Sequence, residues 1–368
     1  MAAFAGERES GGLSMRYSAS KYRRRVVAVV VVVASLLLAT GCRDSRHIPM
    51  KDGRPQITIM VGGLEKVIYL PAMLTERLGY FADADIDVQL LGEQSGATAE
   101  TALLAGDVQG VVGFYDHTID LQAKEQCIQS VVQLADVPGE VQLVSAQDAA
   151  SITSPADFRG KNLGVTSLGS STDFITQALA GQEGMSTEDY TRVKVGAGQT
   201  FIAGMNHDGI DAGMTTDPTV AQMVNSGEAR VLLDMRTEEG TRAALGGLYP
   251  AASLYMGCAM IDAHPEIVGK LASAFVRTLG WIKAHTPEQI AEKMPAQYAG
   301  GDPALYVQSI RDSIGMFNGD GVMKAEGARN VLDILGKYSK NVQPVRDRID
   351  LSKTYTTRFV EQAARAPQ

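Results

Sequence analysis

The stretch "NLGVTSLGSSTDFITQALAGQ", Asn162 to Gln182, decides the type of fold. It begins with a short apolar run, passes through a turn rich in glycine and serine, and continues with apolar residues at helical spacing. A strand that leads through a tight turn into a helix is the repeating unit of parallel α/β architecture. We therefore predict a strand at 162–166 and a helix at 172–182.

The same alternation extends in both directions from this stretch. We predict further strands at 57–61, 86–91, 110–113, 128–134, 192–195, 212–214 and 231–234. Between them we predict helices at 71–78, 97–105, 117–124, 200–206 and 219–226. The elements fall into two series with the same rhythm.

The two series predict two similar lobes. The segment "GDVQGVVGFYDHTIDLQA" aligns with "GIDAGMTTDPTVAQM", so that Asp116 falls on Asp217. After the second series, an apolar strand in "AASLYMGCAMI" and a long helical pattern lead the chain back. We expect an α/β fold of two lobes with a central hinge and an interlobe cleft, since ligands bind beyond the carboxyl ends of such strands. Lobe one is predicted at 56–145, lobe two at 146–248, and the return crossing with the helical completion of lobe one at 249–368.

Charge limits the class of partner. The chain of 368 residues has a formal net charge of -8. Residues 1–41 carry six Lys/Arg and two Asp/Glu, so the remainder has 34-6=28 basic and 42-2=40 acidic residues. Phosphate backbones require a basic face, so this balance argues against nucleic acid as a partner.

The amino-terminal segment has the plan of a signal peptide. Arginines at 23–25 precede the apolar run Val26–Ala34, and small residues follow. A transmembrane helix is the alternative, but the apolar stretch is shorter than the roughly 20 residues that span a bilayer.

The segment "LATGC" resembles the lipobox of bacterial lipoproteins. We therefore expect residues 1–41 to be removed, Cys42 to be lipidated, and 42–55 to form a tether. Acyl chains at this position would anchor the protein to a membrane. Either Met1 or Met15 can be the true start.

Two further cysteines, Cys127 and Cys258, lie in the exported part. Export permits a disulfide between them. The alternative is a pair of buried apolar thiols, and the sequence leaves both open.

The turn before the predicted helix at 172–182 is a candidate anion-binding site. The leading N–H groups of a helix lack backbone partners and the macrodipole adds positive charge there. Gly169 permits a tight turn, and Ser170, Ser171 and Thr172 offer hydroxyl donors. The alternative is a capping box between Ser170 and Asp173.

Polar and aromatic residues follow the central strands of both lobes. In lobe one these are Phe114, Tyr115 and Asp116, and the matching positions in lobe two hold Thr215 and Asp217. We predict ligand contacts from all five. Alternatively, the two aspartates are helix caps and the aromatic rings pack in the core.

Other residues are placed at the cleft by their position after strands or before helices. Gly63 and Leu64 follow the first strand, Glu140 lies near the first crossing, and Gln199 opens a helix. All four are candidate ligand contacts. Lys66 can balance an acid group, or it can be solvated.

Four segments resemble the substrate-binding proteins of ABC importers of the nitrate, sulfonate, taurine and thiamine-pyrimidine group. They are "YLPAMLTERLGYFADADIDVQLL", "DFRGKNLGVTSLGSSTD", "GIDAGMTTDPT" and "YMGCAMIDAHPEIVGKLASAFVRTLGWI". The resemblance implies a type II periplasmic-binding fold, here a lipid-anchored monomer outside the cytoplasm. It also implies capture of a small solute for the transmembrane subunits of a permease.

The loop "GGLEKVIYLP" departs from the family pattern and leaves the solute class open. We expect a small organic anion, sulfonate- or carboxylate-like, with or without an amine. A thiamine-pyrimidine precursor binder, or a synthase-like enzyme on the same fold, is the alternative.

We expect a binding protein and no enzyme. The five histidines show no metal-ligand spacing, and the sequence contains no phosphate-binding loop or nucleophile elbow. The thiamine-pyrimidine synthases carry a cysteine-rich motif that this chain lacks. No cofactor and no metal are expected.

Overall fold

The computed structural model describes residues 48–365. The predicted signal peptide, the lipidation site Cys42 and the first part of the tether lie outside the described residues. Within residues 48–365, no helix is both long and apolar enough to cross a membrane.

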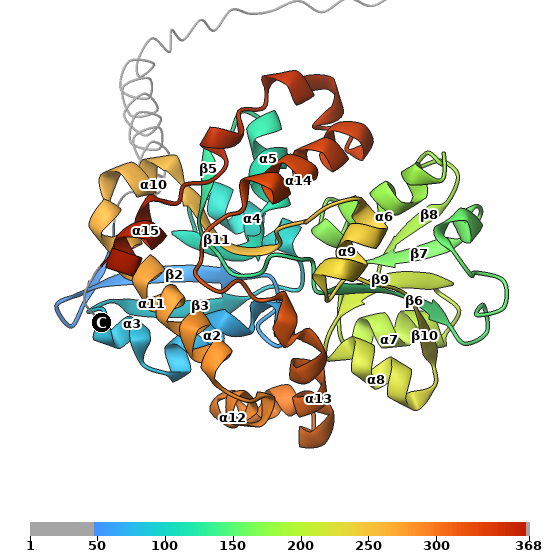
Figure 1. Ribbon diagram of the computed structural model, residues 1–368, viewed down its shortest axis with the longest axis horizontal. Helices are drawn as coiled ribbons and strands as arrows, with labels where there is room; N and C mark the ends of the chain where they lie inside the picture. Colours follow the sequence, from blue (N-terminus) through green and yellow to red (C-terminus); the bar gives the residue numbers. More distant parts are fainter. Residues whose placement is uncertain (1–47, 366–368) are drawn as a thin grey trace, which may run out of the picture. The chain divides into compact units, whose positions relative to one another are not determined.

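The first sheet contains six strands, and helices cover both of its faces (Figure 1). Its strands are β1 (Met50–Lys51), β2 (Arg54–Val61), β3 (Asp87–Gly92), β4 (Gly110–Phe114), β5 (Ile128–Gln133) and β11 (Ala252–Gly257). β2 pairs in parallel with β3 and β4, while β11 lies antiparallel between β4 and β5. The helices α4 (Gly96–Leu104) and α5 (Asp116–Ala123) lie on one face, and α2 (Leu70–Arg77), α3 (Tyr80–Asp83) and α11 (Pro265–Ala284) lie on the other.

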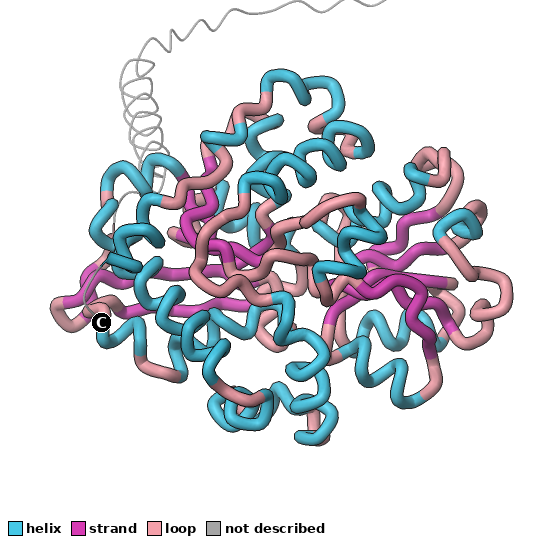
Figure 2. The backbone as a smooth tube through the Cα atoms, viewed as in Figure 1, coloured by secondary structure: helices cyan, strands magenta, loops and turns pink. Residues whose placement is uncertain are grey.

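The second sheet contains five strands in the order β10-β6-β9-β7-β8. Its strands are β6 (Glu140–Ser145), β7 (Asn162–Val165), β8 (Thr191–Lys194), β9 (Ala212–Thr216) and β10 (Ala229–Asp234). The helices α6 (Ser171–Gln182) and α9 (Glu238–Leu245) cover one face, and α7 (Gln199–Asn206) and α8 (Thr219–Ser226) cover the other. Figure 2 shows the two groups of strands, each between helices. The predicted α/β fold of two lobes is confirmed.

The first crossing between the sheets lies earlier than predicted. Lobe one was expected to extend to Ser145, but β6 pairs with β9 and β10 in the second sheet. The change of sheet therefore precedes Glu140. The sequence analysis predicted no strand here because β6 carries Glu140 and Gln142 at buried positions, which interrupts the apolar pattern.

The return segment consists mainly of helices. After β11 come α10 (Cys258–Ala263), α11, α12 (Pro287–Lys293), α13 (Pro303–Ser313), α14 (Ala325–Tyr338) and α15 (Arg358–Arg365). A disulfide joins Cys127, just before β5, to Cys258 at the start of α10. This bond resolves the choice between a disulfide and two free thiols.

Candidate functional site

A cavity of about 20 Å³ lies between the carboxyl ends of the strands of the two sheets. Segments from both lobes line it. The lining residues are Lys66, Ile68, Tyr69, Gly96, Phe114, Glu140, Thr166, Ser170, Ser171, Thr172, Thr215 and Thr216. Six of the thirteen predicted contacts are therefore brought together, namely Phe114, Glu140, Ser170, Ser171, Thr172 and Thr215.

The turn before α6 forms one wall of this cavity. Gly169 has a φ of 79°, in the left-handed region that glycine adopts readily, so the chain can turn sharply into the helix. The capping box between Ser170 and Asp173, which was the alternative to an anion site, does not form. The Ser170 hydroxyl donates to the Ser167 carbonyl oxygen (2.7 Å), and Asp173 accepts from the Gly169 N–H (2.8 Å). Because the N-cap residue Ser170 makes no capping bond to the first turn of α6, the leading N–H groups of the helix are left for an anion within the part of the chain that the structure describes.

The Ser171 hydroxyl connects the two lobes. It donates to Asp116 Oδ1 at 2.9 Å, and the Tyr249 hydroxyl donates to Asp116 Oδ2 at 2.8 Å. Burial raises the pKa of Asp116, against the opposing effects of His117 and of these two hydrogen bonds. Asp116 does not line the cavity, although a ligand contact was predicted for it. Its carboxyl group instead receives bonds from the surrounding protein.

Lys66 is buried at the cavity, with 8% of its surface exposed. Its ammonium group donates to the carbonyl oxygens of Gly62 (2.7 Å) and Gln94 (2.9 Å). Burial lowers the pKa of Lys66 to about 8, while Glu65 and Glu140 act in the opposite direction. Gly63, with a φ of 136°, lies against the aliphatic part of this side chain, where a Cβ would be 2.6 Å from it. Gly63 therefore supports the site from outside the cavity.

Glu140 is the first residue of β6 and is 3% exposed. Its Oε2 atom has no hydrogen-bond partner among the described residues. Burial raises the pKa of Glu140 well above its usual value, Asp116 raises it further, and Lys66 opposes the shift. A buried carboxyl oxygen without a partner is costly, so this atom marks a place where a ligand donor fits.

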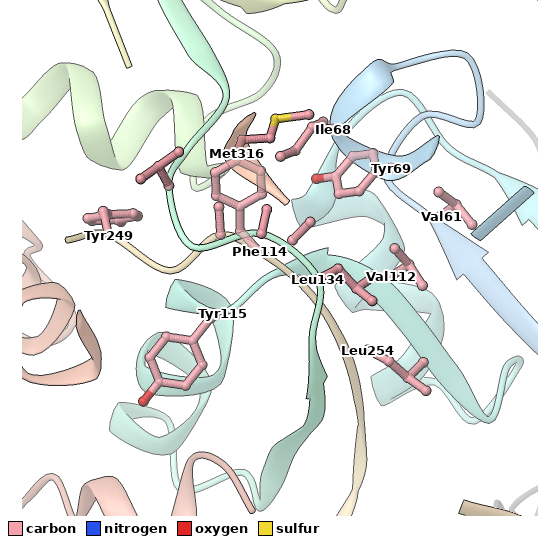
Figure 3. Close-up of a cluster of buried hydrophobic side chains, with 14 of the residues drawn as sticks. Val61, Ile68, Tyr69, Val112, Phe114, Tyr115, Leu134, Tyr249, Leu254 and Met316 are labelled. Carbon is pink, nitrogen blue, oxygen red and sulfur yellow. The ribbon is translucent and has the colours of Figure 1, made fainter. Parts of the chain in front are cut away.

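Aromatic rings form the apolar wall. Tyr69 and Phe114 meet edge to face, with ring centroids 6.3 Å apart, beside Ile68 (Figure 3). Tyr115 points away from them, and its hydroxyl lies 2.6 Å from the hydroxyl of Thr354. The predicted contact from Tyr115 is not supported, because neighbouring residues at a strand end point in opposite directions.

Several other predicted contacts do not line the cavity. Asp217 is paired with Arg236 (3.0 Å), and the side chain of Leu64 packs over Gly92. Gln199 begins α7 at a different place in lobe two. Gly63, Gly169 and Asp116 are also absent from the lining of the cavity, although Asp116 and Gly169 are bonded to or adjacent to lining residues.

Six lining residues were not among the predicted contacts. Lys66 was named only as a balance for an acid group, and Thr216 lies between the predicted contacts Thr215 and Asp217. The sequence analysis missed the other four. Thr166 directly follows β7, and the rule that ligands lie beyond the carboxyl ends of strands could have found it. Ile68 and Tyr69 lie on the short helix η1 (Val67–Tyr69), where nothing in the sequence separates a cavity wall from core packing. Gly96 begins α4 and carries no side chain that would attract attention.

The two α/β lobes with a polar cavity between them define a periplasmic-binding-protein fold. Within this class, the chain belongs to the NMT1/THI5-like family, whose model matches residues 69–290. This match confirms the family expected from the sequence segments.

Individual solved structures and curated proteins are also similar to this chain. A solved structure from Bordetella bronchiseptica RB50 is 31% identical, with a TM-score of 0.80, and the match covers 84% of this chain and 96% of that one. The alkanesulfonate-binding protein SsuA from Xanthomonas axonopodis pv. citri, bound to MOPS, is 17% identical with a TM-score of 0.64, over 82% of this chain and 98% of its own. A curated 4-amino-5-hydroxymethyl-2-methylpyrimidine phosphate synthase from Legionella pneumophila is 22% identical, over 84% of this chain and 94% of its own.

Proposed function

We propose that this protein is the extracytoplasmic solute-binding component of an ABC importer, and that its solute is a small zwitterion. The solute would carry a sulfonate- or carboxylate-like group at one end and an ammonium or ring N–H at the other. The observation that carries this proposal is the buried Glu140 Oε2 atom, which has no partner among the described residues and lies in the same cavity as the uncapped first turn of α6.

The anionic end of the solute would be held at the start of α6. The leading N–H groups of this helix, the hydroxyl groups of Thr215 and Thr216, and the Lys66 ammonium group surround the cavity. Two of the three Lys66 N–H donors are used by carbonyl oxygens, which leaves one for a ligand.

The cationic end would be held by Glu140. An ammonium group would supply the missing partner of Oε2 and favour the ionised form of Glu140, whereas a purely anionic solute would leave Oε2 without that partner. Tyr69 and Phe114 would exclude water from the middle of the solute.

Delivery to a permease would follow capture. Lipidation of Cys42 would keep the protein beside the transmembrane subunits of the importer, and the tether would allow it to reach them. The fold shared with SsuA supports the role of a carrier.

Binding assays with matched solutes test this proposal. We expect taurine to raise the Tm of the purified protein with the logarithm of its concentration above Kd, and ethanesulfonate, which lacks the amine, to bind at least tenfold more weakly. Glu140→Gln should remove the difference between the two. Equal affinities for the two solutes in the wild-type protein, or no binding of either, would overturn the zwitterion proposal.

A thiamine-pyrimidine ligand is the second candidate, and the synthase name of the curated relative favours it. The amino group of an aminopyrimidine could donate to Glu140, and its ring could lie against Phe114. Binding of 4-amino-5-hydroxymethyl-2-methylpyrimidine without turnover would identify a carrier. Formation of the pyrimidine phosphate by the protein would identify an enzyme.

A further inference from the structure

Two buried aspartates occupy equivalent places in the two lobes. Asp116 begins α5 directly after β4, and Asp217 lies between β9 and α8. Each aspartate accepts a hydrogen bond from the hydroxyl group of a serine that is distant in the sequence. Ser171 Oγ donates to Asp116 (2.9 Å), and Ser313 Oγ donates to Asp217 (2.8 Å).

The bond from Ser313 is part of a link between the lobes. Ser313 ends α13, and α13 is tied to α12 by the ion pair between Arg311 and Glu288. The end of α12 is in turn joined to lobe one, because Arg77 of α2 donates to the Lys293 carbonyl oxygen (3.1 Å). α13 therefore lies between the lobes: it is linked to lobe one through α12 and η1 and also packs against α8 of lobe two. The bond from Ser313 joins this bridging helix to Asp217 of lobe two.

A second bond reaches Asp217 from lobe one. The Val67 N–H donates to the Asp217 carbonyl oxygen at 3.0 Å. Val67 is the first residue of η1, and the next two residues, Ile68 and Tyr69, line the cavity. Lobe two thus holds in place the segment of lobe one that forms the apolar wall.

The carboxylate of Asp217 is fixed within its own lobe. Arg236 donates to Oδ2 at 3.0 Å and the Ala221 N–H donates to Oδ1 at 3.2 Å. Arg236 is itself held by Asp234 at 2.6 Å. The side chain is therefore oriented before lobe one approaches, which lowers the entropic cost of forming the contact.

We infer that Asp116 and Asp217 are positioning residues. Their hydrogen bonds from Ser171 and Ser313, which we call the clasps, hold the lobes together and thereby set the affinity for the solute. Neither residue lines the cavity, so we assign both to closure, although Asp116 also raises the pKa of Glu140. This inference rests on the proposed function, because closure matters for binding only if a solute enters the cavity. The cavity of about 20 Å³ has room for about one water molecule, so the solute-bound form must be wider than the structure described here while the hydrogen bonds to Asp116 and Asp217 persist. The apparent Kd of a protein that binds in such a closed form rises as the closed fraction falls.

Ser313→Ala is the most direct variant, since Ser313 touches neither the cavity nor the solute. Loss of a hydrogen bond to a carboxylate should raise the dissociation rate of taurine about tenfold. The association rate should change little. Asp217→Asn, which removes the charge and keeps the carbonyl group of the backbone, should act in the same direction.

Ser309→Ala is the matched control. Ser309 lies on the same helix and is also buried, but its hydroxyl donates within α13 to the Leu305 carbonyl oxygen at 2.9 Å, so the change removes a serine hydroxyl without touching the bond between Ser313 and Asp217. We expect dissociation rates within twofold of wild type. A control as impaired as Ser313→Ala would mean that the integrity of α13, and not the clasp, is responsible.

Closure can also be measured with no solute present. In Ser313→Ala we expect faster amide hydrogen exchange over residues 62–70, which include Val67, and a larger radius of gyration in solution scattering. Wild-type exchange, scattering and dissociation rates in this variant would overturn the inference. If taurine fails to bind any variant while Ser313→Ala still exchanges faster, the clasp stands and the proposed solute falls.

Discussion

Burial of the Glu140 carboxyl group costs free energy, and among residues 48–365 no hydrogen bond to Oε2 offsets this cost. Lys66 lies in the same cavity, but its ammonium group donates to two carbonyl oxygens rather than to Glu140. A protein that only needed to be stable would place an amide or an apolar residue at the start of β6. The arrangement is expected where stability is given up for binding.

We predict that Glu140→Gln stabilises the protein in a pH-dependent manner. The folded protein raises the pKa of Glu140, so the stability contributed by this group is present at low pH and is lost as the pH rises above the ordinary value of 4.5. The variant should therefore match wild type near pH 4 and exceed it by about 1–3 kcal/mol at pH 8. Urea unfolding at the two pH values measures this difference.

Glu65→Gln is the control, because Glu65 is exposed and also lies beside Lys66. It should leave the free energy of unfolding within about 0.5 kcal/mol of wild type at both pH values. A Glu140→Gln variant that is less stable than wild type at pH 8 would show that the carboxylate has a stabilising partner in solution.

At the scale of elements, the first turn of α6 depends on Asp173. This carboxylate accepts two hydrogen bonds from Arg192 of β8, at 2.9 and 3.0 Å, and one from the Gly169 N–H. Asp173 therefore connects α6, the strand β8 and the turn at Gly169, which forms part of the candidate anion-binding site.

We predict that Asp173→Ala lowers the free energy of unfolding by about 2 kcal/mol, since it leaves the partly buried Arg192 without its partner. It should also weaken solute binding, because the turn at Gly169 loses its restraint. A double-mutant cycle with Arg192→Met, read by chemical denaturation and calorimetry, separates the ion pair from the turn. If the ion pair were the whole cause, Arg192→Met would weaken binding as much as Asp173→Ala.

The sequence was sufficient to predict most elements but not their side-chain environment. The helix at 172–182 and the strand at 162–166 could be located because apolar spacing and a glycine turn mark them. The lining residues Ile68 and Tyr69 could not be predicted, because their role depends on a contact from Asp217 in the other lobe. Tyr115 and Phe114 look equivalent in the sequence, and only the strand direction separates the cavity from the core.

At the scale of the whole molecule, the chain passes from the first sheet to the second between β5 and β6, and it returns before β11. The disulfide between Cys127 and Cys258 lies at the start of β5 and just after β11, so it closes a loop that contains the entire second sheet. The bond thus ties together the two ends of lobe two within the body of lobe one. It does not cross the cavity.

This position predicts different effects of the disulfide on stability and on closure. The bond spans 131 residues, and constraint of so long a loop in the unfolded chain is worth about 4–5 kcal/mol in the chain-entropy model. The double variant Cys127→Ser with Cys258→Ser should lose stability of that order in guanidinium unfolding. Its amide exchange over residues 62–70 and its affinity for taurine should stay within twofold of wild type, because the clasps at Asp116 and Asp217 lie elsewhere. Faster exchange over 62–70 in this variant would show that closure depends on the rigidity of lobe one as well as on the contacts between the lobes.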